Sequence, residues 1–168
     1  DMFRKEGINK VIETALEVGH KYVVIPYLTE EQRGTTIDVY KKLAEECNKW
    51  GDACNRQGLQ LAYHNHDFEF HVTDGVEPYD VLLNEVDADK MAMEMDLFWM
   101  FKANKDPLAY FAKHPGRFKL WHVKDMDKQG QFADVGTGTI NFAKIFAASK
   151  QAGVEHRFVE RDQTPDKL

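Results

Sequence analysis

The stretch Leu59-Gln60-Leu61-Ala62-Tyr63-His64-Asn65 (residues 59–65) is short and largely apolar, and it directly follows Gly58, a residue type that commonly ends helices. Before it, apolar side chains recur at helical spacing over residues 37–54, with Thr35 or Thr36 as the expected N-cap. A buried strand that follows a long helix is the repeating unit of α/β proteins. The stretch therefore predicts a strand in a fold of that class.

The same alternation extends in both directions from this strand. Because the predicted strands start about 27 to 39 residues apart, each connection has room for a crossover helix, and the sheet is expected to be parallel. The further predicted elements are helices over residues 8–16, 79–86, 107–113 and 142–152, the last capped by Thr139, and strands over residues 22–25, 91–96, 118–124 and 157–162.

A closed barrel is favoured over an open sheet, because no glycine-rich dinucleotide or phosphate-binding motif follows any predicted strand. A complete (β/α)8 barrel takes about 250 residues. We therefore predict that residues 1–168 form a single domain, the C-terminal part of a TIM barrel that covers about its last five βα units. Either a missing N-terminal segment or a homo-oligomer would complete such a barrel.

Composition excludes two classes of partner. The formal net charge of −6 has the wrong sign for holding a phosphate backbone, so no nucleic acid is expected. No run approaches the about 20 apolar residues of a membrane span. Cys47 and Cys54 lie about 10 Å apart along the predicted helix, too far for a disulfide. Free thiols favour the cytoplasm, and secretion stays open because a preceding segment is expected.

Ligand-capable side chains gather at the carboxyl ends of four predicted strands. Residues two apart on a strand share a face. This pairs His64 with His66, Glu94 with Asp96, His122 with Lys124 and Glu160 with Asp162.

In parallel α/β folds these strand ends form the active-site rim. A cluster of like charges is costly to bury without a cation, so the pattern predicts one divalent metal ion, Mn, Zn, Co or Mg, held by His64, Asp96, His122 and Glu160. Glu94 is expected to be a partner of a ligand or a buried structural acid.

Five segments resemble the sugar phosphate isomerase/epimerase superfamily, the xylose isomerase-like barrels that include AP-endonuclease-type enzymes. They are Tyr63-His64-Asn65-His66-Asp67-Phe68-Glu69-Phe70, Glu94-Met95-Asp96-Leu97-Phe98-Trp99, His122-Val123-Lys124-Asp125, Gly136-Thr137-Gly138 and Val159-Glu160. The resemblance implies a (β/α)8 barrel with one divalent metal held by Glu, Asp, His and a second Glu. Asp96, His122 and Glu160 match the last three ligands, and His64 stands where the first Glu is expected.

The resemblance also implies roles in proton transfer next to the carbonyl of a sugar or polyol. Glu160 would be ligand and base, with His66 or Glu69 as the second acid/base group. Lys124, Trp99 and Asn65 are the expected substrate contacts. Because His64 replaces a glutamate of the epimerase pair, three outcomes remain open: an isomerase or epimerase, a lyase or dehydratase acting on keto sugars or inositol derivatives, and a non-catalytic carbohydrate-binding barrel. An endonuclease-like hydrolase is disfavoured by the acidic charge.

Overall fold

The computed structural model describes residues 2–163 and divides the chain into two compact units. The first unit contains residues up to His64 together with Glu69–Ala92. The second contains Asn65–Phe68 and the residues from Met93 onward. Each unit alternates strands and helices, and every pairing between crossover-connected strands within a unit is parallel, as the spacing of the predicted strands indicates.

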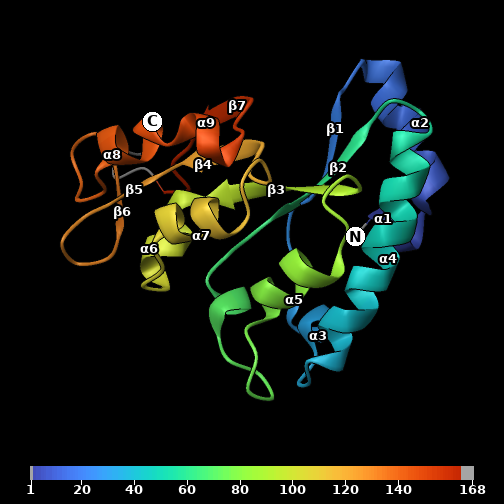
Figure 1. The fold of residues 1–168 in the computed structure, drawn as a ribbon, viewed down its shortest axis with the longest axis horizontal. Helices are drawn as coiled ribbons and strands as arrows, with labels where there is room; N and C mark the ends of the chain where they lie inside the picture. The colour runs from blue at the N-terminus through green and yellow to red at the C-terminus, as the bar shows by residue number, and fades with distance from the viewer. Residues whose placement is uncertain (1, 164–168) are drawn as a thin grey trace. The chain divides into compact units, whose positions relative to one another are not determined.

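The first unit is built on the parallel pair β1 and β2, in register from Tyr22↔Gln60 to Ile25↔Tyr63, with α2 and α4 packed against the strands (Figure 1). Its buried side chains come from both strands and from the inner stripe of α4. The elements are α1 (Met2–Lys5), α2 (Ile8–Val18), β1 (Tyr22–Ile25), α3 (Glu30–Arg33), α4 (Asp38–Asn55), β2 (Gln60–His64), the 3-10 turn η1 (Phe68–Phe70), which begins in the second unit, and α5 (Pro78–Glu85).

The second unit is built on three parallel strands, with β4 paired on one side to the end of β3 and on the other side to β7 (Figure 1). The short antiparallel hairpin of β5 and β6 follows β4. The elements are β3 (Met91–Asp96), which begins in the first unit, α6 (Leu97–Lys102), α7 (Pro107–Lys113), β4 (Leu120–Val123), β5 (Asp125–Met126), β6 (Phe132–Ala133), α8 (Phe142–Ala147), α9 (Ser149–Ala152) and β7 (His156–Val159).

Helix caps are where the local predictions fail. No threonine caps α4: its N-cap is Ile37, whose N–H donates to Asp74, a residue far along the chain (2.9 Å). Thr139 does not cap α8 either, because its hydroxyl donates to the carbonyl of Met126 and the cap is Asn141. At the start of α4 the oxygen that accepts a backbone N–H comes from Asp74, and at the start of α8 it comes from the side chain of Asn141. The predicted helix over residues 142–152 is divided into α8 and α9.

The last strand also departs from the prediction. β7 ends at Val159, so Glu160 and Asp162 lie just beyond the strand. Val159, an apolar residue, is 75% exposed. All four residues of β7 are exposed, and packing therefore contributes little to holding its end in place.

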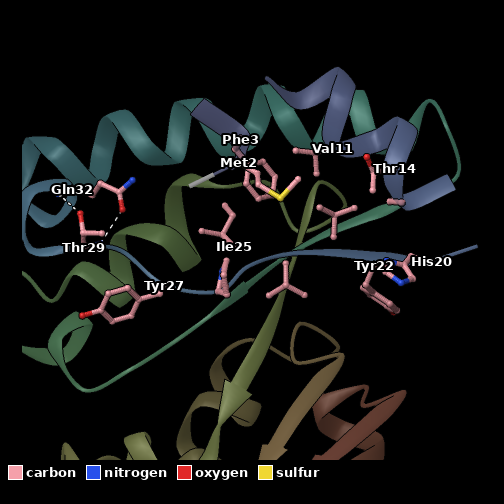
Figure 2. A pocket seen from close by; sticks show the side chains of 14 residues that line it. Met2, Phe3, Val11, Thr14, His20, Tyr22, Ile25, Tyr27, Thr29 and Gln32 are labelled. Carbon is pink, nitrogen blue, oxygen red and sulfur yellow. Dashed lines mark hydrogen bonds between the residues drawn. The ribbon is translucent and has the colours of Figure 1, made fainter. Parts of the chain in front are cut away.

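An apolar cavity of about 720 Å³ lies in the first unit beside β1. Figure 2 shows Met2 and Phe3 of α1 and Val11 of α2 on one side of it and Ile25 of β1 on the other. The hydrogen bonds between Thr29 and Gln32 that cap α3 lie at one end (Figure 2). The described lining includes no carboxylate and no lysine or arginine, so none of the acids of the second unit's cluster has a counterpart here.

Both cysteines are free and buried in α4, as predicted. Burial raises the pKa of the Cys54 thiol to about 11, so this thiol is uncharged at neutral pH. Within residues 2–163, no helix combines the length and the apolar character needed to cross a bilayer.

Candidate active site

The polar cluster of the second unit is centred on His122, the third residue of β4. The backbone register places Asp96 of β3 and Phe158 of β7 directly beside it. Because the strands are parallel, their carboxyl ends meet at one edge, and the first residue beyond β7, Glu160, reaches the same edge. Nδ1 of His122 lies 2.5 Å from Oε2 of Glu160 and 3.8 Å from Oδ2 of Asp96.

Glu94 approaches His122 from the opposite side of the ring. Its Oε1 lies 3.2 Å from Nε2 of His122, and its side chain is only 8% exposed. A carboxylate on the far nitrogen of an imidazole fixes the orientation of the ring and directs the other nitrogen outward. Of the two roles predicted for Glu94, the structure supports that of partner to a ligand.

Lys124 is buried among three carboxylates. Its Nζ lies 3.2 Å from Asp96, 3.0 Å from Glu160 and 2.9 Å from Asp162. Burial alone would lower the pKa of Lys124, but the charge of Asp96 and the hydrogen bonds to Asp162 and Glu160 raise it to about 12. The ammonium group is therefore charged at neutral pH and is suited to stabilising an anion rather than to accepting a proton.

Glu160 is the most accessible of the acids that touch His122. Its side chain is 42% exposed, whereas those of Glu94 and Asp96 are buried. Partial burial raises the pKa of Glu160, but the hydrogen bond and charge of Lys124, together with His122, outweigh burial and lower it. Glu160 is therefore ionised at neutral pH and able to accept a proton.

Asp96 is fully buried and is held by its neighbours from two directions. Its Oδ1 accepts the N–H of Trp99 and so caps α6 (3.1 Å), which leaves Oδ2 facing His122 and Lys124. Its backbone N–H donates to Oδ1 of Asn65 (3.0 Å). Asn65 is itself fully buried, so its amide positions the end of β3, and this pairing accounts for Asn65 without the predicted contact to substrate.

Two predicted site residues, His66 and Trp99, contact each other although they are distant in the sequence. The rings of His66 and Phe68 stack at 5.4 Å, and His66 also contacts Trp99 at 5.5 Å. Trp99 in turn meets Phe132 of β6 edge to face. Both His66 and Trp99 are half-buried, which is compatible with their predicted roles as acid/base group and substrate contact.

His64 and Glu69 belong to the first unit. His64 ends β2, and its Nδ1 lies 3.1 Å from the carbonyl oxygen of Pro26. A carbonyl only accepts, so Nδ1 carries the hydrogen and Nε2 is the nitrogen with a lone pair for a metal. Glu69 is fully buried and accepts a hydrogen bond from the hydroxyl of Tyr63 (2.8 Å), an interior position that argues against its predicted role in proton transfer.

The donor set of the second unit fits a divalent cation. Asp96, His122 and Glu160 supply two carboxylates and an imidazole, and atoms bound about 2.0–2.2 Å from one metal lie roughly 3–4 Å apart. The distance from Nδ1 of His122 to Asp96, 3.8 Å, lies within that range, and the distance to Glu160, 2.5 Å, lies below it. Among the described residues of this cluster, four carboxylates meet one lysine and one histidine, so they carry excess negative charge that a cation would balance.

Sequence reasoning missed Asp125, Asp134 and Arg161. The carboxylate of Asp125 is 1% exposed and accepts four backbone N–H groups of the following loop. A signal was present, because Gly136 and Gly138 follow Asp125 at a distance that allows a loop to fold back on it. For Asp134 and Arg161 no sequence signal was available, since their ion pair joins residues 27 positions apart.

Parallel strands joined by helices, with polar side chains gathered at the carboxyl ends of the strands, are the architecture of α/β barrels. The comparison with known proteins gives the particular family. Residues 3–163 match the family described as xylose isomerase-like TIM barrel, and the chain belongs to it. This membership confirms the predicted fold class.

Similar proteins are found by sequence and by structure. The chain is 28% identical over 154 residues to an inosose dehydratase of Lacticaseibacillus casei, an alignment that covers 79% of the chain and 50% of that protein. A sugar phosphate isomerase/epimerase from Parabacteroides distasonis superimposes with a TM-score of 0.81 at 26% identity, covering 95% of the chain and 58% of the other. The chain thus spans about half the length of the curated relatives it matches.

A third similar structure, the IolI protein with a bound zinc atom, has a TM-score of 0.73 at 20% identity and covers 92% of the chain and 59% of its own length. At this identity the likeness shows the fold alone.

Proposed function

We propose that this chain is part of a metal-dependent enzyme that transfers a proton next to the carbonyl group of a sugar or polyol. The observation that carries the proposal is the cluster around His122, in which Asp96 and Glu160 face one ring nitrogen, Glu94 faces the other and Lys124 supplies a single fixed positive charge. These are the groups that such a reaction requires: metal ligands, a base and a cation for the developing oxyanion.

Asp96, His122 and Glu160 of the second unit would hold the metal. His64, the fourth ligand predicted from the sequence, belongs to the first unit and would offer Nε2. When bound, a divalent metal acts as a Lewis acid that polarises the carbonyl oxygen of the substrate. Mixed carboxylate and imidazole donors suit Mn, Zn or Co, and Mg would be favoured by additional oxygen ligands.

The residues around the metal divide the proton chemistry between them. Glu160 is ionised and accessible, so it accepts the proton from the carbon next to the carbonyl. Lys124 stays charged and stabilises the negative oxygen that results. The second acid/base group would be His66, a choice supported by its half-buried position against Phe68.

The step after proton removal distinguishes two candidate reactions. Return of a proton to a carbon completes an isomerisation or epimerisation, which is our first candidate. Loss of a hydroxyl group from the neighbouring carbon as water completes a dehydration, and this second candidate is favoured by the relatives named inosose dehydratase. Both begin with the same step at Glu160.

The metal site is tested by elemental analysis and metal titration of the purified chain. We expect one divalent ion per chain, and we expect His122→Ala to lose it because the substitution removes the central ligand. His71→Ala is the matched control, since His71 is an exposed histidine outside the cluster, and it should bind as the wild type does. Full metal occupancy in His122→Ala would count against the site.

The reaction is tested by nuclear magnetic resonance in deuterated water with a panel of keto sugars and a cyclic keto polyol. Deuterium appearing beside the carbonyl with all hydroxyl groups retained supports the isomerase or epimerase. Loss of a hydroxyl with formation of an unsaturated ketone supports the dehydratase. Binding with neither exchange nor dehydration would overturn the catalytic proposal and leave a carbohydrate-binding barrel.

A further inference from the structure

The end of β7 needs support from outside its own strand. β7 is exposed along its length, and the pairing with β4 ends at one bond, from the N–H of Glu160 to the carbonyl of Val123 (3.3 Å). Glu160 nevertheless lies 2.5 Å from His122 and 3.0 Å from Lys124. Another element must therefore restrict this segment.

The next residue, Arg161, supplies a connection to the β5–β6 hairpin. Its guanidinium lies 2.6 Å from the carboxylate of Asp134 and donates to the carbonyl of Phe132 (3.5 Å). Asp134 directly follows β6, and its own carbonyl accepts the N–H and the hydroxyl of Thr137. An exposed ion pair by itself is weak. The connection can therefore restrict Glu160 only if the hairpin is held in place by other contacts.

Asp125 fixes that hairpin. One carboxylate oxygen accepts the N–H of Met126 (2.8 Å) and of Ile140 (3.2 Å), and the other accepts the N–H of Gly136 and Gly138 (both 2.9 Å). The loop packs so tightly that a Cβ on Gly138 would lie 2.3 Å from the same carboxylate and 2.5 Å from the carbonyl of Met126. No side chain larger than hydrogen fits there without moving the loop.

We propose that Asp125 is a positioning residue: by gathering the loop over residues 126–140 it places Asp134 against Arg161 and thereby holds Glu160 beside His122 and Lys124. The proposal rests on the proposed function for its catalytic meaning, because Glu160 is the base and metal ligand of that site. Its structural part, the coupling between Asp125 and Glu160, is measured independently of any reaction.

The main test is Asp125→Asn, which keeps the shape of the side chain. An amide has one acceptor oxygen, so two of the four N–H groups lose their partner. We expect the amide of Glu160 to exchange its hydrogen faster and the affinity for Zn²⁺ or Co²⁺ alone to fall by about 10- to 100-fold, the range for removing a residue that orients ligands. With a substrate, kcat should fall more than KM rises.

Three further variants separate positioning from loss of stability. Gly138→Ala changes no charge and should act in the same direction as Asp125→Asn. Asp134→Asn breaks only the connection to Arg161 and should weaken metal binding by up to about fivefold, the factor for an exposed ion pair. Restoring the pair in reverse, with Asp134→Arg and Arg161→Asp together, should recover part of the loss.

Asp127→Asn is the matched control, because Asp127 accepts backbone N–H groups at the tip of the same hairpin and takes no part in the Asp125 contacts. It should leave metal affinity and the Glu160 amide at wild-type values. If Asp125→Asn does not fold, Gly138→Ala and Asp134→Asn decide the question. Wild-type amide exchange at Glu160 in the loop variants overturns the positioning proposal, whereas a wild-type chain that binds no metal overturns the proposed function instead.

Discussion

At the scale of single residues, the site depends on which carboxylate touches which atom of His122. Glu94 and Glu160 both contact the ring, but Glu94 is buried against Nε2 and Glu160 is accessible at Nδ1. The same residue type therefore has two environments: the buried glutamate contacts the imidazole from behind, and the accessible one is the group that the proposed function assigns to the metal and the substrate.

Glu94→Gln should weaken metal binding without changing the fold. The amide can still contact Nε2, but it lacks the negative charge of the carboxylate that orients the ring, so we expect about a 10-fold loss of metal affinity by isothermal titration. Glu155→Gln is the control, because Glu155 pairs with Lys119 on the surface of the same unit. Unchanged affinity in Glu94→Gln would contradict the orienting role.

Tyr63→Phe should cost stability. The change removes the hydroxyl that donates to Glu69 and leaves a buried carboxylate short of a partner, so we expect a loss of about 1–3 kcal/mol in the free energy of unfolding. Urea titration measures it. The comparison is Tyr27→Phe at a 45% exposed position, where a change within about 0.5 kcal/mol is expected. Equal losses in the two variants would show that the buried pair contributes nothing.

At the scale of elements, close approach between α4 and the turn before β3 determines how the first unit packs. Gly51 lies in α4, and a Cβ there would be 2.4 Å from the carbonyl oxygen of Lys90. The helix contacts backbone directly at this point, so a larger residue must displace either the helix or the turn.

Gly51→Ala should therefore destabilise the chain even though alanine is the better helix former. Overpacking typically costs about 1–3 kcal/mol, which exceeds the gain of up to about 1 kcal/mol from helix propensity. Thermal unfolding of the variant shows whether the net change in stability is a loss or a gain. Gly58→Ala is the comparison. A Cβ at position 58 would have no atom within 4 Å, so the only strain there comes from the φ of +74°. A stabilised Gly51→Ala would show that the turn moves freely.

At the scale of the whole molecule, stability at alkaline pH depends on buried phenols. Burial, and then the charge of Glu69, raise the pKa of Tyr40 and Tyr63 above the ordinary value of 10.0. A raised pKa in the folded state means that the neutral form is favoured by folding. The contribution is complete below about pH 10 and is lost as the pH rises above it.

Unfolding and ionisation of these two tyrosines should accordingly coincide. In the absorbance of tyrosinate, the signals of Tyr40 and Tyr63 should appear only with the loss of circular dichroism. Tyr40→Phe and Tyr63→Phe each remove one late signal, which assigns it. Ionisation of both groups in a fully folded chain would contradict their burial.

The sequence by itself was enough to predict the five strands β1, β2, β3, β4 and β7 and the longer helices between them, but not the short elements α1, α3, α6, β5 and β6. Strand β3 and helix α7 have the predicted bounds, and residues two apart on one strand do face the same cluster, as His122 and Lys124 show by contacting the same carboxylates. Hydrophobic periodicity is a local property of the chain, and it is therefore readable without the fold.

Only the tertiary structure decided which partners each polar residue has and how deeply it is buried. Asn65 accepts the backbone N–H of Asp96, and the buried Glu69 accepts the hydroxyl of Tyr63. Asp125 accepts backbone N–H groups of the loop that follows it. Burial and hydrogen-bond partners come from residues distant in sequence, and no pattern of residue types records them. For the same reason the helix caps at Ile37 and Asn141 differed from those expected: the atoms that satisfy a helix end are chosen by what folds next to it.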